Sequence, residues 1–200
     1  GVRKFVFAKR YNKEPLVEAD LIHLSTIKAT NAGIKDLSGL EKCRALASLD
    51  LAGNAITDFS AIKDLKRIQY LNLEVNTLGA DGLEALCSHG LNNMLQVLNL
   101  ASVGIMEADS LRAVQALGNS ICKAKKLKAI DFNLNPPTAR SAAELTRLLA
   151  RARRKDSKIE EFIVTTELSH DAFVTLNLDP SAMSTWTQKM EDRGLCRRTP

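Results

Sequence analysis

Aliphatic residues recur along this chain in short blocks in which apolar and polar positions alternate. Residues 27–40 align with residues 49–62, and further blocks of the same kind begin at Leu71, Leu98, Ile130 and Phe162. The first residues of successive blocks are 22, 22, 27, 32 and 32 residues apart. Periods of this length are typical of solenoids, in which each unit buries its apolar face against its neighbours. One further step of 22 residues towards the N-terminus reaches residues 5–7, which we predict to be a first strand.

Numbered so that the first residue of each block is position 4, the repeat carries apolar residues at positions 1, 4 and 6. Because side chains alternate along a strand, positions 3, 5 and 7 face the other way. The pattern predicts one parallel sheet in sequence order above an aliphatic core, with Leu73 and Leu100 fully buried. The predicted strands begin near Val2, Leu24, Leu46, Ile68, Leu95, Leu127 and Ile159.

Asparagine recurs at position 9 of the repeat, where the chain turns out of the strand. Its amide can bond backbone groups of the neighbouring turns, so we expect irregular turns where it is missing. The position is filled by Asn54, Asn76 and Asn135, and elsewhere by Ala32, Val103 and Glu167.

The segments between strands are of two kinds. The steps of 22 residues leave room for one or two helical turns, as in residues 60–65. In the longer steps, Leu111, Val114, Leu117 and Ile121 recur at helical spacing, with Asp109 as candidate N-cap. Residues 138–152 predict another helix, capped by the threonine that follows two prolines.

The template L-x-x-L-x-L-x-x-N-x-L resembles the leucine-rich repeat family over residues 2–178. The resemblance implies an α/β solenoid domain of about six to seven repeats over residues 1–178, with a curved parallel sheet on the concave side and helices and turns on the convex side. The short repeats resemble phosphatase-regulator proteins, and the longer ones resemble ribonuclease inhibitor and tropomodulin. We expect residues 179–200 to form a C-terminal cap or tail, with Trp186 covering the end of the core or anchoring a partner.

Composition narrows the class of protein. With 200 residues, 45% of them hydrophobic and 26% charged, the chain is that of an ordinary globular protein. The longest uncharged stretch, residues 85–106, contains five His, Asn and Gln side chains and predicts no membrane span. The four cysteines and three histidines form neither a disulfide framework nor a zinc motif, so we expect reduced thiols, no metal and no cofactor. We expect a cytoplasmic protein, with cytoskeletal, ciliary and nuclear sites as alternatives.

Positions 3, 5 and 7 line the face of the sheet with which such solenoids commonly bind, and its centre is small, polar and mildly acidic. A partner carrying Lys or Arg would suit it, whereas the alternative is a solvated face with no ligand. The candidate partner-binding residues are Asp50, Tyr70, Asn72, Glu74, Asn99, Asp131 and Asn133.

Positive charge is concentrated near the C-terminus. Residues 1–120 carry equal numbers of acidic and basic side chains, so the net charge of +5 comes from residues 121–200. A basic patch there would suit a filament, an acidic lipid or nucleic acid, although no aromatic residue between 132 and 162 supports base stacking. The alternative is that these cations complement helix dipoles. The candidate patch is Arg147, Arg151, Arg153, Arg154 and Lys155.

Catalytic motifs are missing from the sequence. It contains no G-x-S-x-G elbow and no phosphate-binding loop, and Glu160 and Glu161 alternate along a predicted strand and so face opposite ways. We therefore predict a non-enzymatic adaptor that binds protein partners within a larger intracellular assembly. The alternatives are a cytoskeletal, ciliary or axonemal component docking through its basic half, and a regulatory subunit of a phosphatase or small GTPase.

Overall fold

A computed structural model describes residues 18–88, 91, 94–153 and 158–164. The chain divides into two compact units, residues 1–166 and 167–200, and every described residue belongs to the first. The strand predicted at residues 5–7, the boundary predicted at residue 178 and the cap predicted at Trp186 lie outside the described residues.

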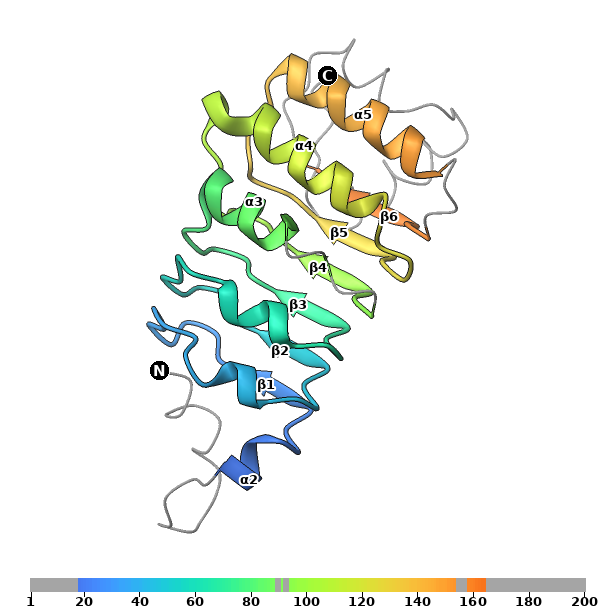
Figure 1. The fold of residues 1–200 in the computed structure, drawn as a ribbon. Helices are drawn as coiled ribbons and strands as arrows, with labels where there is room; N and C mark the ends of the chain where they lie inside the picture. The colour runs from blue at the N-terminus through green and yellow to red at the C-terminus, as the bar shows by residue number, and fades with distance from the viewer. Residues whose placement is uncertain (1–17, 89–90, 92–93, 154–157, 165–200) are drawn as a thin grey trace, which may run out of the picture. The chain divides into compact units, whose positions relative to one another are not determined.

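Six short strands form one parallel sheet in sequence order (Figure 1). In-register pairing joins the same repeat position on every strand, as in Leu49 with Leu71 and Leu71 with Leu98. The predicted parallel order is therefore confirmed. The strands are β1 (Thr26–Lys28), β2 (Ser48–Asp50), β3 (Tyr70–Asn72), β4 (Val97–Asn99), β5 (Ala129–Asp131) and β6 (Glu161–Ile163).

Each strand begins two residues later than predicted, at position 3 rather than position 1. The position-1 residue still belongs to the turn that closes the preceding helix, because the Leu46 N–H donates to the Cys43 carbonyl at 3.0 Å. Beyond each strand the ladder of backbone hydrogen bonds continues by one or more residues. The Leu73 N–H, for example, donates to the Asn99 carbonyl at 2.9 Å.

Helices and turns cover one face of the sheet and lengthen along the chain (Figure 1). The predicted turn at residues 60–65 is confirmed as a 3-10 helix, and the longer segments form α-helices. The elements are α2 (Glu18–Leu21), η1 (Leu40–Lys42), η2 (Ser60–Asp64), α3 (Gly79–Ser88), η3 (Glu107–Asp109), α4 (Ser110–Ile121) and α5 (Ala139–Arg153).

The two predicted helix caps differ. Thr138 caps α5 as expected, because its Oγ1 accepts a hydrogen bond from the Ser141 N–H at 3.1 Å. Asp109 stands at the N-cap position of α4 but makes no capping hydrogen bond, so that prediction was only half right. The preceding η3 already gives Asp109 a helical backbone, and its carboxylate lies 4.0 Å from the Arg112 guanidinium instead.

The aliphatic core lies between the sheet and the helices. Position-4 and position-6 residues are buried in every complete repeat, and Leu73 and Leu100 are both fully buried, as predicted. Between α4 and α5 the packing depends on Gly118, since an added Cβ there would lie 2.5 Å from Leu148 Cδ1. The two helices approach each other closely because this position carries no side chain.

Buried asparagines at position 9 connect successive repeats in the turns that follow the strands. The Asn76 amide donates to the Leu51 carbonyl of the preceding repeat at 3.0 Å and to the Leu73 carbonyl of its own at 2.9 Å. Its Oδ1 accepts from the Ile56 N–H at 3.3 Å. Asn54 and Asn135 make equivalent bonds, so the predicted bonding of position 9 is confirmed. The irregular turns expected at Ala32 and Val103 are not found, since the residue before each has the same left-handed backbone as in the other repeats.

The residue before position 9 adopts a left-handed backbone in five successive repeats. The φ angles are 51° at Asn31, 68° at Gly53, 50° at Val75, 52° at Ser102 and 56° at Leu134. Asn and Gly tolerate this region, whereas a β-branched residue such as Val75 is strained there. The turn geometry is thus imposed by the repeat rather than by the residue that occupies it.

We expect Leu100→Ala to lower the free energy of unfolding by about 2–5 kcal/mol, because it removes a buried side chain and leaves a cavity. Leu134→Ala is the matched control, since Leu134 is 68% exposed. Its effect should stay within about 0.5 kcal/mol. Urea denaturation measures both, and equal losses would show that the repeat register is wrong.

Asn76→Ala should destabilise the chain by at least about 2 kcal/mol, because it leaves several buried backbone groups without partners. The control is Asn119→Ala, which changes an exposed asparagine on α4. If both variants unfold at the same urea concentration, the asparagine bonds between repeats contribute nothing to stability.

Candidate functional site

The candidate partner-binding residues lie on the face of the sheet turned away from the core, which we call the outer sheet face. Register places Asp50, Asn72, Asn99 and Asp131 in one row across β2 to β5. Tyr70 stands in the neighbouring row, between Ser48 and Val97. The period-two alternation of the sequence therefore assigned these residues to the correct face.

Tyr70 is the centre of a polar cluster on this face. Burial is the main cause that raises the pKa of its phenol, and the carboxylates of Asp50 and Glu74 raise it further. Asn72 acts in the opposite direction through a hydrogen bond to the phenol. On the far side of Glu74, the Asn99 Nδ2 donates to Glu74 Oε2 at 3.3 Å. The structure thus brings five of the seven predicted residues together.

The position-5 residues of β2 to β5 also hold the turn that follows their strand, a role that the sequence analysis did not assign to them. Each Oδ1 accepts a hydrogen bond from the backbone N–H two residues later, at 3.2 Å for Asp50, 3.0 Å for Asn72, 2.9 Å for Asn99 and 2.9 Å for Asp131. These Asx turns explain why the short side chains of Asp and Asn occupy this row. Each residue keeps its remaining polar atom for other contacts.

Asn133 extends the cluster towards the C-terminal end of the sheet. It follows Asp131 at position 7, and its N–H is the donor to the Asp131 carboxylate. The Asn133 Oδ1 is buried and has no hydrogen-bond partner in the described part of the chain. Asp131 and Asn133 therefore adjoin the Tyr70 cluster through Asn99 rather than contacting the phenol.

The candidate basic patch is only partly described. Arg147 on α5 forms two hydrogen bonds to the Glu144 carboxylate, at 2.8 and 2.6 Å, so its charge is partly compensated by its own helix. Arg151 is exposed on the same helix. Arg153 ends α5, and Arg154 and Lys155 lie outside the described residues.

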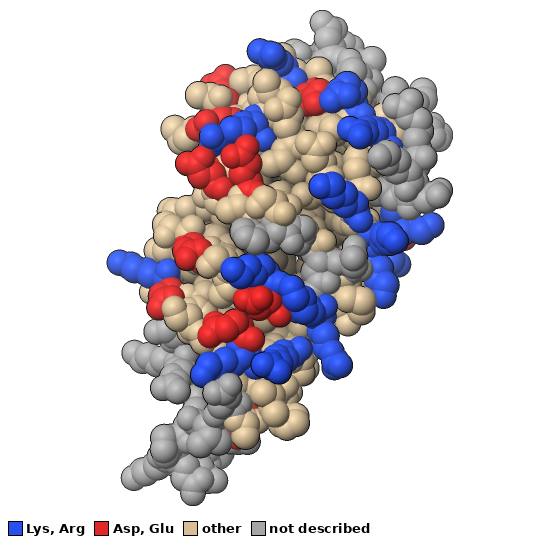
Figure 2. Space-filling view, in the orientation of Figure 1, with Lys and Arg blue, Asp and Glu red and all other residues tan. Residues whose placement is uncertain are grey.

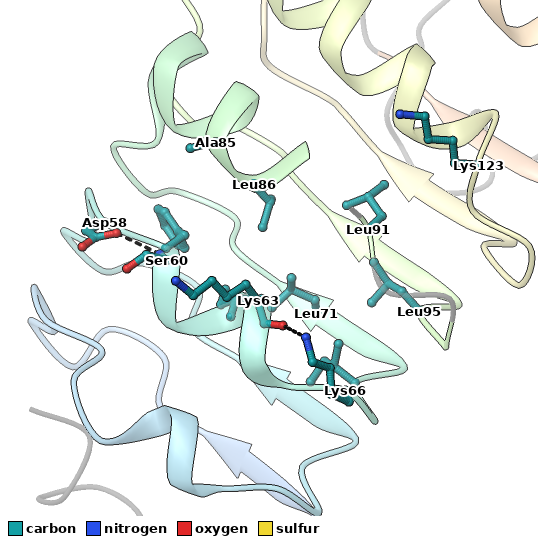
Figure 3. A pocket seen from close by; sticks show the side chains of 13 residues that line it. Asp58, Ser60, Lys63, Lys66, Leu71, Ala85, Leu86, Leu91, Leu95 and Lys123 are labelled. Atoms are coloured by element: carbon teal, nitrogen blue, oxygen red, sulfur yellow. Dashed lines mark hydrogen bonds between the residues drawn. The ribbon is translucent and has the colours of Figure 1, made fainter. Parts of the chain in front are cut away.

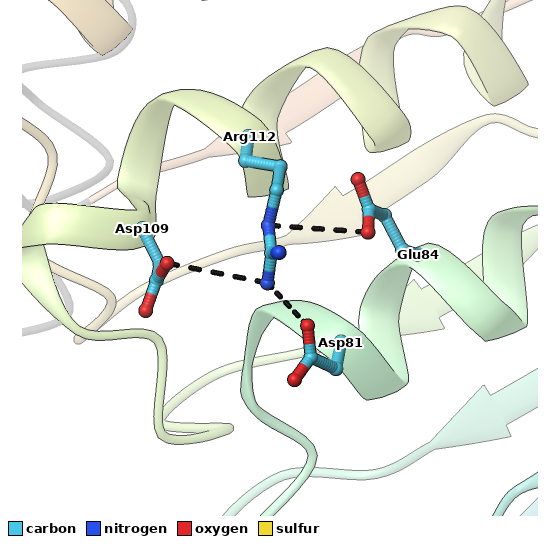
Figure 4. A network of polar contacts seen from close by, with 4 residues as sticks. All are labelled: Asp81, Glu84, Asp109 and Arg112. Carbon is cyan, nitrogen blue, oxygen red and sulfur yellow. Dashed lines mark hydrogen bonds and ion pairs between the residues drawn. The ribbon is translucent and has the colours of Figure 1, made fainter.

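Acidic and basic side chains are distributed unevenly over the helical face. Figure 2 shows many Lys and Arg side chains along the right margin, whereas acidic side chains gather towards the left and lower centre with further cations among them. The acidic group surrounds Arg112 of α4, which contacts Asp81 and lies 3.9 Å from Glu84 and 4.0 Å from Asp109 (Figure 4). Acidic residues at helix N-termini complement the helix dipole. All four side chains are substantially exposed, so these ion pairs contribute little to stability.

The helical face also carries a pocket that the sequence analysis did not predict. Its volume is about 330 Å³, and it lies between η2 and the C-terminal end of α3 (Figure 3). Apolar side chains such as Leu71, Leu86 and Leu95 form its inner wall. Lys63, Lys66 and Lys123 also line it, although they come from segments far apart in sequence.

Metal and membrane sites receive no support from the described residues. Among them, no group of three His, Cys, Asp or Glu side chains is placed to hold a metal ion. No helix in the same part of the chain is long and apolar enough to cross a bilayer. Cys43, Cys87 and Cys122 are free thiols, and burial raises the pKa of the Cys87 thiol to about 11, which makes it unreactive.

Comparisons with known proteins agree with this architecture. A family model described as Leucine Rich repeat matches residues 42–62 and 68–87. A search of curated proteins found no significant match.

Three solved structures show the same arrangement of repeats. Internalin C2 of Listeria monocytogenes is 20% identical with a TM-score of 0.60, and the match covers 88% of this chain and 69% of the internalin. The internalin InlF of the same organism is 17% identical with a TM-score of 0.57, covering 88% and 45%. Leiomodin-1 actin-binding site 2 is 11% identical with a TM-score of 0.52, covering 88% and 92%. At these identities the likeness concerns the fold.

We expect the phenol of Tyr70 to titrate at a higher pH than a free tyrosine, because burial and two carboxylates oppose the phenolate. Asp50→Asn should lower this pKa part of the way, since burial remains the larger cause. Phenolate absorbance in a Tyr11→Phe background reports Tyr70 alone, as the chain has two tyrosines. Asp131→Asn, two strands from the phenol, serves as control, and an equal effect of both variants would contradict the geometry.

Proposed function

We propose that this chain, which is a leucine-rich repeat protein, acts as an adaptor that binds a protein partner through the Tyr70 cluster on the outer sheet face. We propose further that it does so within a larger intracellular assembly and without catalysing a reaction. Leucine-rich repeat proteins are generally interaction modules, and the fold exposes one sheet face as a continuous platform. The observation that carries the proposal is the clustering of an aromatic residue with carboxylates and amides on that platform.

Tyr70 supplies the anchor of the proposed interface. Its ring is half-buried by its neighbours, so it is already held in place and loses little conformational freedom on binding. Aromatic residues of this kind dominate the energetics of many interfaces. The carboxylates of Asp50 and Glu74 lie beside it and favour a partner surface that carries Lys or Arg.

A second candidate is docking on a filament through the basic patch. Leiomodin-1, one of the structural neighbours, is described as an actin-binding site, and Arg151 is exposed on α5. The pairing of Arg147 with Glu144 weakens this candidate, because a compensated cation attracts an acidic filament less strongly. Regulation of a phosphatase or small GTPase is a third use of the same sheet face.

The test is binding of a purified partner, identified by affinity purification with the wild-type chain, to a set of variants. Tyr70→Ala should weaken binding by about 1–3 kcal/mol. Asp50→Asn removes the charge and keeps the turn, since Asn72 and Asn99 hold the equivalent turns in neighbouring repeats. It should slow association, and Asp50→Lys should slow it further.

The matched comparison is the triple variant Arg151/Arg153/Arg154→Glu. If it abolishes binding while Tyr70→Ala and Asp50→Lys bind as wild type, the basic patch is the interface and the sheet proposal is wrong. Steep weakening by salt would also indicate the patch. Phosphatase and GTPase assays with and without the chain decide the regulatory alternative.

A further inference from the structure

The pocket on the helical face lies where the solenoid changes from short to long repeats. On one side stands η2, a 3-10 helix of 5 residues, and on the other stands α3, an α-helix of 10 residues. The two elements cannot pack along their whole lengths, because the first is shorter and has only half as many residues as the second. The recess of about 330 Å³ opens beside the end of α3, with Leu91 and Leu95 also in its lining (Figure 3).

The inner wall of this recess is made of core residues. The pocket is lined by five residues that are buried in the core: Phe59, Ile68, Leu71, Leu91 and Leu95. Side chains of this kind present an apolar surface that gains free energy when another apolar group covers it. The volume lies at the lower end of the range of ligand pockets, which suits one bulky side chain better than a large cofactor.

The rim is positively charged on two opposite sides. Lys63 and Lys66 stand on the η2 side, and Lys123 reaches in from the end of α4 (Figure 3). None of the three forms an ion pair with a carboxylate of the described residues. The Lys66 ammonium donates to the Lys63 carbonyl at 2.6 Å, which holds it beside the opening.

Among the described residues that line the pocket, Asp58 is the single carboxylate, and it does not balance these charges. Asp58 accepts a hydrogen bond from the Ser60 N–H at 2.8 Å, and hydrogen bonds to Ser60 are the main cause that lowers the pKa of its carboxyl. The Lys63 charge adds only a smaller share. The rim therefore keeps a surplus of positive charge around an apolar recess.

We infer that this pocket binds an acidic linear segment of a partner protein, which inserts one bulky apolar side chain and sets carboxylates on either side of it. Charge complementarity selects this occupant, because the cations stand on opposite sides of the recess. An apolar chain with one carboxylate, such as a fatty acid, would satisfy only one side. This surface lies on the helical face and is independent of the Tyr70 cluster on the outer sheet face.

The experiment measures fluorescence anisotropy of a short fluorescein-labelled peptide with a central tryptophan and two glutamates on each side. We expect saturable binding that weakens with salt. The same peptide with glutamines in place of the glutamates, or with glycine in place of the tryptophan, should bind much more weakly. No saturable binding of the acidic peptide, or equal binding of all three, would overturn the proposal.

Variants locate the site on the chain. Ala85→Phe adds a side chain to an exposed position that lines the pocket and should block the peptide without removing a core residue. Lys63→Glu and Lys123→Glu should each weaken binding by about threefold to tenfold. Lys125→Glu is the matched control, because it makes the same charge change two residues from Lys123 and outside the pocket lining.

Two results assign the pocket differently and so overturn the proposal. Loss of peptide binding in Tyr70→Ala with normal binding in Ala85→Phe would place the peptide on the outer sheet face. Decanoate that displaces the peptide and binds with equal affinity would make the pocket a site for a small amphiphile. Thermal unfolding of each variant shows that it is folded, and the lysine variants keep the test decisive if Ala85→Phe does not fold.

Discussion

A strand of three residues cannot hold a repeat in place by itself, and the structure depends on how the backbone groups beyond each strand are satisfied. A buried N–H or carbonyl without a partner costs more than most single contacts contribute. The position-9 asparagines meet this requirement, and each of them serves the turn of the repeat before it: Asn54 bonds Ile34, Asn76 bonds Ile56 and Asn135 bonds Val103. Valine is tolerated at residue 103 because the next repeat supplies the amide that its own N–H needs. Valine has no side-chain amide with which to bond the turn of the preceding repeat. There the Val103 carbonyl accepts a hydrogen bond from the Gly79 N–H at 2.9 Å instead.

Most of the fold follows from the spacing of apolar residues, because a stacked core requires the same positions to be buried in every repeat. That spacing predicted the parallel order, the register and the buried leucines correctly. The first residue of each strand was predicted two positions early, since an apolar residue at position 1 is buried whether it belongs to a strand or to a turn. The side chain of Asp109 was also misjudged, because its preference for Arg112 depends on the neighbouring helix and not on local sequence. Val75 and Leu134 adopt left-handed backbones that neither residue type favours, so only the geometry of the repeat explains them.

The outer sheet face shows what the alternation of side chains along a strand can predict and what it cannot. It identified which side chains share the face, but it could not distinguish a side chain held in a turn from one free to bind. Asp50 and Asn72 are held in a turn, since an oxygen of each accepts a backbone hydrogen bond, and the rest of each polar group stays near the Tyr70 phenol. The turn fixes the orientation of the polar groups before any partner arrives. An interface built on such residues pays little entropy for ordering them.

The pocket on the helical face could not be predicted from the sequence, for a different reason. Lys63 and Lys123 are about two repeats apart in the sequence, and only the stacking of η2, α3 and α4 brings them to the same recess. The recess itself arises because sheet strands keep one spacing while the helices on the other side change length. A solenoid of uniform repeats would pack its helical layer without such a gap. The spacing of the repeats in the sequence changes from 22 to 27 and then 32 residues. This change of repeat length therefore produces the recess. It adds a basic, apolar recess among the helices to a chain whose outer sheet face is acidic.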